Sequence, residues 1–379
     1  MTTFEPVKGF RDFTGEDALK RAQIRKILVE TFEKYGFQPA ETPIIEQAEF
    51  VKGENSNDEA VSDIFKLQDR GKRDLALRYE FTFQIKRLMN NKKLPYKRYQ
   101  IGEVFRDEPV SANRFRQFVQ CDIDTIGSTV KDEAEVLAAA SEILERLGLK
   151  FVIYVNNRKL LNEILEKEGV EPRNTEKVMK VIDKLDKLPE EEVYNELMLY
   201  NAKNILELFK KPEKFFEKYE NYKEIKQLKE FCELYNVEIK FQPSLARGLS
   251  YYNGTVFEVK TKELKETITA GGSYMFNSVQ CTGISLGLDR LSGITKIDSE
   301  TESYLIVSLE QDKKAIELAQ KLRNSGKVVT ILYGKPSKAL EYANSYSINK
   351  VIFVGSEEVK SKQFKVKDMK TGKESLFKI

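Results

Sequence analysis

The chain has 379 residues, of which 41% are hydrophobic and 32% charged, a composition typical of a folded globular protein rather than a disordered one. Its formal net charge is only +3, and it contains no histidine. The absence of imidazole excludes Ser-His-Asp and Cys-His catalytic triads and every zinc site that needs a histidine ligand.

The length predicts two or three domains. The N-terminal stretch MTTFEPVKGFRDF has no apolar segment of the kind a secretory signal needs, and no apolar run is long enough to span a membrane. We therefore expect a cytoplasmic protein with no membrane partner. Cys121, Cys232 and Cys281 lie far apart without a CxxC pair, so we expect small buried side chains and no metal site built from cysteine or histidine.

The predicted elements of the first half alternate between helix and strand. Residues 16–35 show apolar side chains at three- and four-residue spacing and end at Gly36, which predicts a helix. The segments 97–106 and 115–127 flank a polar loop and predict an antiparallel pair of strands. A helix is expected at 131–146, followed by the strand FVIYVN.

From 158 to 236 the pattern is almost wholly helical, and the aromatic residues from Phe215 to Tyr235 recur at a spacing that a helix buries. Strand character returns at 237–260 and 280–288, and Asp289 begins another helix. The tail alternates strand, helix, strand, helix, strand from YLIVSL to VIFVG, which predicts a small α/β domain with some parallel pairing.

Charge is unevenly distributed along the chain. Residues 303–379 hold 15 Lys and Arg against 8 Asp and Glu, a net of +7, whereas the remainder holds 48 against 52, a net of −4. A basic C-terminal unit suits a polyanionic partner, but lysines on the surface of a small domain give the same count, so charge alone leaves both interpretations open.

Several short motifs are weak singly and informative in their order. They are KGFRDFTGEDALKR with GFQPAETPIIE, LALRYEFT, FRDEPVSANRFRQFVQCDIDTIG, VNNRKLLNEIL, LARGLSYYNGTVFEV, AGGSY, GISLGLDRL and KVKDMKTGKES. Together the chain resembles the histidyl-tRNA synthetases, a class II aminoacyl-tRNA synthetase family, over almost its whole length. The QCDID ending of the third motif is similar to archaeal and eukaryotic members.

The resemblance implies an α+β fold. Its catalytic core is a six-stranded antiparallel sheet with helices, formed by residues 1–157 and 237–300. A helical insertion would occupy 158–236 and a small α/β anticodon-binding domain 303–379. It also implies a homodimer that uses ATP with Mg²⁺, L-histidine and tRNA(His) and forms a histidyl-adenylate. The alternative is a catalytically inactive relative, such as a regulatory subunit, or a plain tRNA-binding module.

The resemblance also assigns candidate site residues. Arg106 and Arg247 would be catalytic and hold the α-phosphate of ATP. The residues implied to bind ATP are Arg106, Glu108, Arg114, Arg116, Phe118, Arg247 and Arg290. Arginine suits this task because its planar guanidinium binds phosphate through two hydrogen bonds and stays charged. Any one of these arginines could instead be a surface ion pair, but five at matching positions favour function.

The substrate histidine would contact a second group of residues. By the same resemblance they are Glu80, Thr82, Gln120, Asp124, Tyr252, Tyr274, Gly271 and Gly272. Asp124 and Tyr252 would take the two ring nitrogens, and Gly248 would let backbone approach the ligand. Strand alternation puts Asp122 on the same face as Asp124 and turns Tyr251 away from Tyr252, into the core.

The chain departs from the family pattern at Tyr79, Ser250, Ser273 and Met275, which affects the rim of the expected pocket. Without histidine, a group of the protein itself would titrate near neutrality only if a carboxylate had an unusually shifted pKa. An inflection near pH 6 to 7 is therefore predicted to belong chiefly to the substrate imidazole.

Overall fold

The structure is a computed structural model that describes residues 4–53, 61, 63–111, 114–247, 251–264, 266–297, 302–334 and 338–378. Gly248 and Ser250, both singled out above, lie outside these ranges. The chain divides into two compact units, one formed by residues 1–12 and 24–296 and the other by 13–23 and 297–379. Within the described ranges, no helix combines the length and apolarity that crossing a membrane requires.

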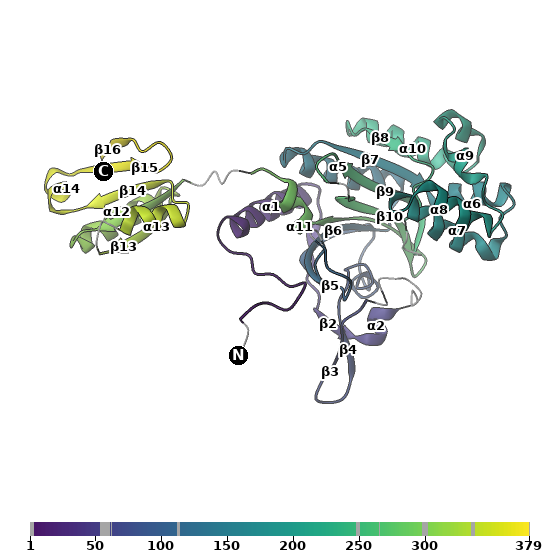
Figure 1. The fold of residues 1–379 in the computed structure, drawn as a ribbon, viewed down its shortest axis with the longest axis horizontal. Coiled ribbons are helices and arrows are strands. Elements are labelled where there is room, and N and C mark those ends of the chain that lie inside the picture. The colour runs from purple at the N-terminus through teal and green to yellow at the C-terminus, as the bar shows by residue number, and fades with distance from the viewer. Residues whose placement is uncertain are drawn as a thin grey trace. The chain divides into compact units, whose positions relative to one another are not determined.

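The larger unit is built on an eight-stranded sheet with the order β1-β5-β6-β11-β10-β9-β7-β8 (Figure 1). The strands are β1 (Gln38–Pro39), β5 (Tyr96–Phe105), β6 (Gln117–Ile126), β7 (Phe151–Asn157), β8 (Ile239–Phe241), β9 (Tyr252–Thr261), β10 (Thr269–Phe276) and β11 (Val279–Gly287). The six from β5 to β7 pair antiparallel throughout, as expected. The short edge strands β1 and β8 widen the sheet by parallel pairing.

Long helices bury the apolar faces of this sheet. The helix expected at 16–35 is α1 (Gly15–Lys34), and that expected at 131–146 is α5 (Val130–Arg146). Asp132 accepts a hydrogen bond from the backbone N–H of Thr129 at 2.8 Å, which caps the start of α5. Helix α5 packs against β11, β6 and α10 (Tyr222–Leu234), so its alanine-rich centre is wholly buried.

The predicted helical segment between β7 and β8 is confirmed. Its elements are α6 (Arg158–Lys167), the 3₁₀ turn η1 (Pro172–Asn174), α7 (Thr175–Ile182), η2 (Asp183–Asp186), α8 (Glu190–Met198), α9 (Ile205–Phe209), η3 (Glu213–Lys218) and α10. Helices α6 to α9 group together beside the sheet (Figure 1). Their buried aliphatic side chains form a separate cluster.

The aromatic stretch from Phe215 to Tyr235 is not one helix. The Glu163 carboxylate accepts hydrogen bonds from the backbone N–H groups of Glu220 and Asn221, at 3.0 and 2.9 Å, and so starts α10 separately from η3. Tyr235, beyond the end of α10, is 44% exposed. The middle of the stripe is buried, Phe215 and Phe231 are half-buried, and the last member, Tyr235, lies on the surface.

A small three-stranded sheet, β2-β4-β3, adjoins the larger one and supports the segment that leads to Glu80. Its strands and neighbouring helices are β2 (Ile45–Gln47), α2 (Ala48–Lys52), β3 (Lys66–Gln68), β4 (Asp74–Leu77) and α4 (Ile85–Leu88). The core between them includes Val51, Ala76, Tyr79 and Phe83. The short helix α11 (Leu288–Ile294) follows β11, beginning one residue before the expected Asp289.

The smaller unit has a five-stranded sheet with the order β13-β12-β14-β15-β16. Its elements are β12 (Ser303–Ser308), α12 (Asp312–Asn324), β13 (Val328–Tyr333), α13 (Ala339–Ser345), β14 (Lys350–Val354), α14 (Ser356–Ser361), β15 (Gln363–Asp368) and β16 (Glu374–Lys378). The predicted parallel pairing is confirmed for β12 with β13 and with β14. The antiparallel β15–β16 hairpin was not foreseen.

All three cysteines are free and buried, as expected.

Candidate active site

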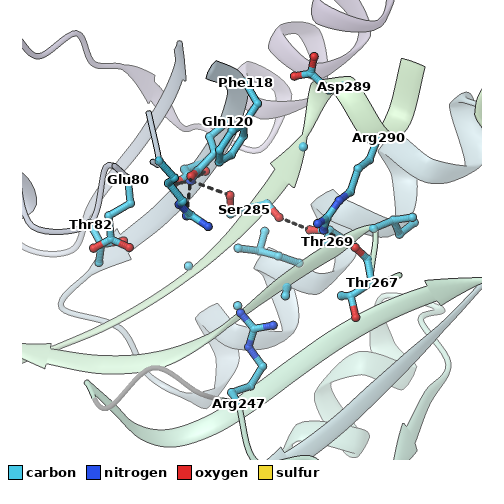
Figure 2. Close-up of a pocket in the computed structure, with 18 of the residues that line it drawn as sticks. Glu80, Thr82, Phe118, Gln120, Arg247, Thr267, Thr269, Ser285, Asp289 and Arg290 are labelled. Carbon is cyan, nitrogen blue, oxygen red and sulfur yellow. Dashed lines mark hydrogen bonds between the residues drawn. The ribbon is translucent and has the colours of Figure 1, made fainter. Parts of the chain in front are cut away.

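A pocket lies over the middle of the large sheet, lined by residues from β6, β10, β11 and the segments around 80, 110 and 250. Figure 2 shows Glu80, Thr82 and Gln120 at one side of it and Thr267 and Arg290 at the other, with Arg247 pointing in between. The lining includes most of the residues that sequence patterns singled out: Glu80, Thr82, Arg106, Glu108, Arg114, Phe118, Gln120, Asp124, Arg247, Tyr252, Gly271, Tyr274 and Arg290.

Strand alternation explains how β6 supplies so much of the lining. Phe118, Gln120, Asp122 and Asp124 are every second residue, so their side chains leave the same face of the sheet. β6 is paired with β5 and β11 along this stretch, which holds these four positions in line.

Three of the arginines that line the pocket are Arg106, Arg114 and Arg290. The guanidinium of Arg106 lies 5.1 Å from the centroid of the Phe118 ring and donates to the Gln120 side chain at 3.3 Å. Arg114 pairs with Glu108 at 3.2 Å, and Arg290 donates to the carbonyl oxygen of Thr267 at 2.7 Å. Burial, together with the nearby positive charge of Arg114, lowers the pKa of Arg290.

Such a concentration of positive charge is stable only where it faces anions or water. Four guanidinium groups line the pocket, counting Arg247. This arrangement is suited to a polyphosphate, whose oxygens can each accept hydrogen bonds from an arginine.

Arg247 has an unusual backbone conformation. Its φ is +56°, in the left-handed region that side chains other than glycine seldom adopt. Its Nη1 lies 2.8 Å from Oε1 of the buried Glu258, while the buried Nε makes no hydrogen bond to any described residue. Burial by itself would lower the pKa of Arg247. Electrostatic interactions with Tyr252 and Glu258 have the larger effect and raise the pKa, so the side chain stays charged.

Two buried carboxylates also line the pocket. Asp124 lies 2.7 Å from Nη2 of Arg98 and also accepts a hydrogen bond from the Tyr274 hydroxyl. Asp122 accepts two hydrogen bonds of 3.2 Å from Nε2 of Gln120, which also donates to Ser285 at 3.0 Å. A polar lining of this kind is suited to a ligand that carries N–H donors.

Burial raises the pKa of Asp122 to about 6, with Asp124 adding to the effect and Arg98 opposing it. A carboxylate with this shift is a second candidate, beside the substrate imidazole, for an inflection near pH 6. Strand alternation predicts the two carboxylates on one face, but most of the shift comes from desolvation, which no local pattern reports.

Glycines keep the floor of the pocket open. A Cβ on Gly283 would lie 2.1 Å from Oδ1 of Asp124, its cross-strand partner. A Cβ on Gly271 would lie 2.1 Å from the carbonyl oxygen of Gly283. Both contacts are far too short. The Asp124 carboxylate therefore keeps its place only while position 283 has no side chain, and β10 and β11 keep their spacing only while position 271 has none.

The prediction that Tyr251 points away from the pocket is wrong. Tyr251 lines the pocket beside Tyr252, their ring centroids 4.8 Å apart, and its hydroxyl lies 3.5 Å from Oε2 of Glu80. Alternation predicts opposite faces only within a strand, and β9 begins at Tyr252, so Tyr251 belongs to the turn before it.

Two expected site residues do not line the pocket. Arg116 pairs with Asp107 at 3.1 Å, and its side chain fills the space next to Gly9. Gly272 lies beneath the Tyr252 ring, where a Cβ would come within 2.8 Å of the ring carbons. Gly272 therefore makes room for an aromatic wall of the pocket rather than for a ligand.

Three of the residues that depart from the family pattern lie within the described ranges, and none of the three lines the pocket. Ser273 donates to the buried carboxylate of Glu133 on α5, and Met275 is 47% exposed. Tyr79 is buried, and its carbonyl oxygen accepts a hydrogen bond from Nε of Arg106 at 3.2 Å. Tyr79 thus supports a pocket arginine through its backbone carbonyl. A residue with a different side chain at position 79 could make the same hydrogen bond.

Sequence reasoning missed several residues of the site. They are Glu258, Thr267, Gly283, Ser285 and Asp289, all within quoted motifs or beside them. Asp289 accepts a hydrogen bond from the backbone N–H of Val119 at 2.8 Å and so ties α11 to β6. The position of Asp289 directly after the glycine-rich GISLGL strand was the sequence feature that could have indicated this role. Within the described ranges, no group of three Asp, Glu or Cys side chains is placed to hold a metal ion.

Comparison with known proteins extends this description over the whole chain. The family described as histidyl-tRNA synthetase matches residues 9–291, and an anticodon binding domain matches residues 303–379. The chain belongs to the histidyl-tRNA synthetase family. It is therefore an α+β protein of the class II synthetase type.

Curated relatives and solved structures agree with this membership. Histidine–tRNA ligase 1 of Bacillus cereus is 34% identical over 414 residues, covering 99% of this chain and 97% of the relative. Histidine–tRNA ligase of Methanocaldococcus jannaschii is 33% identical and covers 100% of this chain and 98% of the relative. The crystal structure of histidyl-tRNA synthetase from Nostoc sp. PCC 7120 is similar with a TM-score of 0.87 at 25% identity, covering 100% of this chain and 97% of that one.

Proposed function

We propose that the protein attaches L-histidine to tRNA(His) in two steps. The carboxylate of histidine attacks the α-phosphorus of ATP, and pyrophosphate leaves with the bonding electrons. The 3′ end of the tRNA then takes the acyl group from the histidyl-adenylate, and AMP leaves. The observation that carries the proposal is a single pocket lined by four arginines and by a pair of buried carboxylates.

The arginines would supply the chemistry of the first step. In-line displacement at phosphorus depends on positioning and on stabilisation of developing negative charge more than on proton transfer. Arg106 and Arg247 would hold the α-phosphate, and Arg114 and Arg290 the outer phosphates. Glu108 would accept from the adenine amino group, and Phe118 would stack on the adenine ring. Arg116 would act only indirectly, through its pairing with Asp107.

The residues around the carboxylate pair would select the amino acid. Asp124 would accept a hydrogen bond from one ring nitrogen, and the Tyr252 hydroxyl would contact the other. Glu80, Thr82 and Gln120 would bind the α-amino group. Tyr274 would close the pocket, while Gly271 and Gly272 would keep space beneath the ligand and the Tyr252 ring.

Mg²⁺ would enter with the phosphates of ATP, whose oxygens are its preferred ligands. We assign no step to the ion, because the described acidic residues form no cluster that would hold it alone.

The remaining assignments concern organisation. We propose a catalytic domain from residues 1–157 and 237–300, with 158–236 as its helical insertion, and an anticodon-binding domain from 303–379. The net charge of +7 in the last segment suits tRNA. We also propose that the protein works as a homodimer in the cytoplasm.

ATP–pyrophosphate exchange, run with each of the twenty amino acids in turn, tests the proposal. We expect exchange with histidine and little with the other nineteen, and charging of tRNA(His) in a second assay. Exchange that depends on a different amino acid would refute the assignment of Asp124 and Tyr252. Absence of exchange with every amino acid, in protein that still binds ATP, would favour the catalytically inactive relative.

A further inference from the structure

Arg98 is the largest side chain that the structure buries completely, and it does not line the pocket. It lies on β5 directly opposite Asp124 on β6, so both side chains leave the same face of the sheet. Its Nη2 lies 2.7 Å from Oδ2 of Asp124 and donates to the carbonyl oxygen of Phe81 at 3.3 Å. Its Nε and Nη1 make no hydrogen bond to any described residue.

An arginine buried in this way costs stability, because its guanidinium leaves water and only part of its hydrogen-bonding capacity is used. A well-packed apolar side chain would serve the sheet at least as well. Among the residues that the structure describes, Arg98 makes its ionic contact with a carboxylate that lines the pocket. The arrangement therefore favours a role in the site rather than in the fold.

The Asp124 carboxylate is held on three sides. Arg98 holds Oδ2, the Tyr274 hydroxyl donates to Oδ1, and Oδ1 fills the space that a Cβ on Gly283 would occupy. Each carboxylate oxygen can accept more than one hydrogen bond, so a ligand N–H can still bind. The remaining direction of approach is from the pocket.

The positive charge of Arg98 also favours a role in the site. Burial raises the pKa of Asp124, and the positive charge of Arg98 opposes that rise. Arg98 therefore favours the ionised Asp124, which accepts hydrogen bonds and donates none.

We propose that Arg98 is a positioning residue for amino-acid selection: it fixes the Asp124 carboxylate so that this carboxylate accepts the ring N–H of the substrate histidine. The inference rests on the proposed role of Asp124 in binding the ring. Arg98 itself touches no substrate. Its contribution passes entirely through Asp124.

A double-mutant cycle with Arg98→Met and Asp124→Asn tests the proposal, read out by ATP–pyrophosphate exchange at saturating ATP. We expect each single variant to raise the KM for histidine roughly 10- to 100-fold, the effect of losing a hydrogen bond to a charged group. The KM for ATP should change less than about twofold. Arg98→Lys should recover part of the loss, because an ammonium group can still pair with Oδ2.

The double variant gives the decisive comparison. If Arg98 acts through Asp124, Arg98→Met has nothing further to remove once Asp124 is Asn, and the KM of the double variant should match that of Asp124→Asn. Multiplying effects, or an unchanged KM in the Arg98 variants, would overturn the proposal. An unchanged KM in Asp124→Asn alone would instead overturn the ring-binding assignment, and the positioning role with it.

Arg78→Met is the matched control. Arg78 is also buried, and its guanidinium donates to the carbonyl oxygens of Glu103 and Thr42 at 2.7 and 2.8 Å. Its loss should lower the melting temperature without a selective rise in the KM for histidine. If Arg98→Met fails to fold, the test uses Arg98→Lys and the double variant, which leaves no unpaired buried carboxylate at position 124. Arg98→Lys must then raise the KM for histidine selectively. The same substitution must cause no such rise when Asp124 is already Asn.

Discussion

Glu258 holds Arg247 by an ion pair in which Nη1 and Oε1 lie 2.8 Å apart, although Arg247 precedes the strand that carries Glu258. The second oxygen of Glu258 accepts a hydrogen bond from Thr267 at 3.0 Å, so the carboxylate is itself held in place. The contact fixes the direction of a guanidinium whose backbone has a left-handed φ. It makes Arg247 a rigid donor toward the pocket, which is what stabilisation of a transition state requires.

Arg247→Ala is predicted to lower kcat for ATP–pyrophosphate exchange by about 100-fold or more, since one such donor contributes roughly 3 kcal/mol to a transition state. The KM for histidine should change much less. Steady-state exchange kinetics check this, with Arg173→Ala, which removes an exposed ion pair to Glu171, as the control. A near-normal kcat in Arg247→Ala would remove this residue from the catalytic assignment.

Glu258→Gln should lower kcat in the same direction as Arg247→Ala but by less, on the order of 10-fold. The amide keeps the shape and can still accept from Thr267, but it loses the charge that orients the guanidinium. Glu171→Gln, at an exposed ion pair, is the matched control. Equal kcat values for Glu258→Gln and the wild type would show that the left-handed backbone alone positions Arg247.

Gly283→Ala should raise the KM for histidine more than the KM for ATP. The added methyl group would lie 2.1 Å from Oδ1 of Asp124, so the carboxylate has to move. Gly293→Ala, in α11, is the control, because a Cβ there meets nothing within 4 Å. Equal KM changes for the two substrates would mean that the alanine distorts the whole sheet instead of the acid alone.

Asp122→Asn provides a prediction about pH. The pKa of Asp122 in the folded protein is about 6, above its ordinary value of 3.8, so the folded state binds a proton that the unfolded state has lost between these values. This group's contribution to stability is present below pH 3.8 and is lost as the pH rises through 6, a change of roughly 3 kcal/mol. The stability of Asp122→Asn relative to wild type should therefore increase from pH 4 to pH 7, measured by urea denaturation. A constant difference would show that Asp122 does not titrate in this range.

The same variant separates enzyme from substrate in the pH dependence of activity. If Asp122 causes an inflection of kcat/KM near pH 6, Asp122→Asn should remove it. If the substrate imidazole causes it, the inflection should persist in Asp122→Asn and move downward with a triazole analogue of lower ring pKa.

Removal of residues 303–379 should leave adenylate formation intact and weaken tRNA charging. The described pocket lining lies entirely between residues 80 and 290, whereas the deleted segment carries the net charge of +7. Retained pyrophosphate exchange shows that the shortened protein is folded, and the KM for tRNA and its salt dependence then measure the loss. An unchanged KM for tRNA, or loss of exchange, would contradict the proposed division of labour.

Much of the fold follows from local sequence patterns. Apolar spacing located α1 and α5, and strand alternation correctly put Asp122 and Asp124 of β6 on one face. These features depend on neighbours within a few residues, which periodicity reports directly. The resemblance to the synthetases added candidate residues, most of which line one pocket.

Tertiary structure alone decided the rest, because desolvation and contacts between distant segments leave no local pattern. The pKa of Asp122 depends on its burial, and the role inferred for Arg98 depends on a partner 26 positions away across β5 and β6. Tyr251 faces the pocket because β9 starts one residue later than alternation assumed. The sequence by itself determined which chemistry the protein can perform; the packing of its sheet determined which charges are held still and which can titrate.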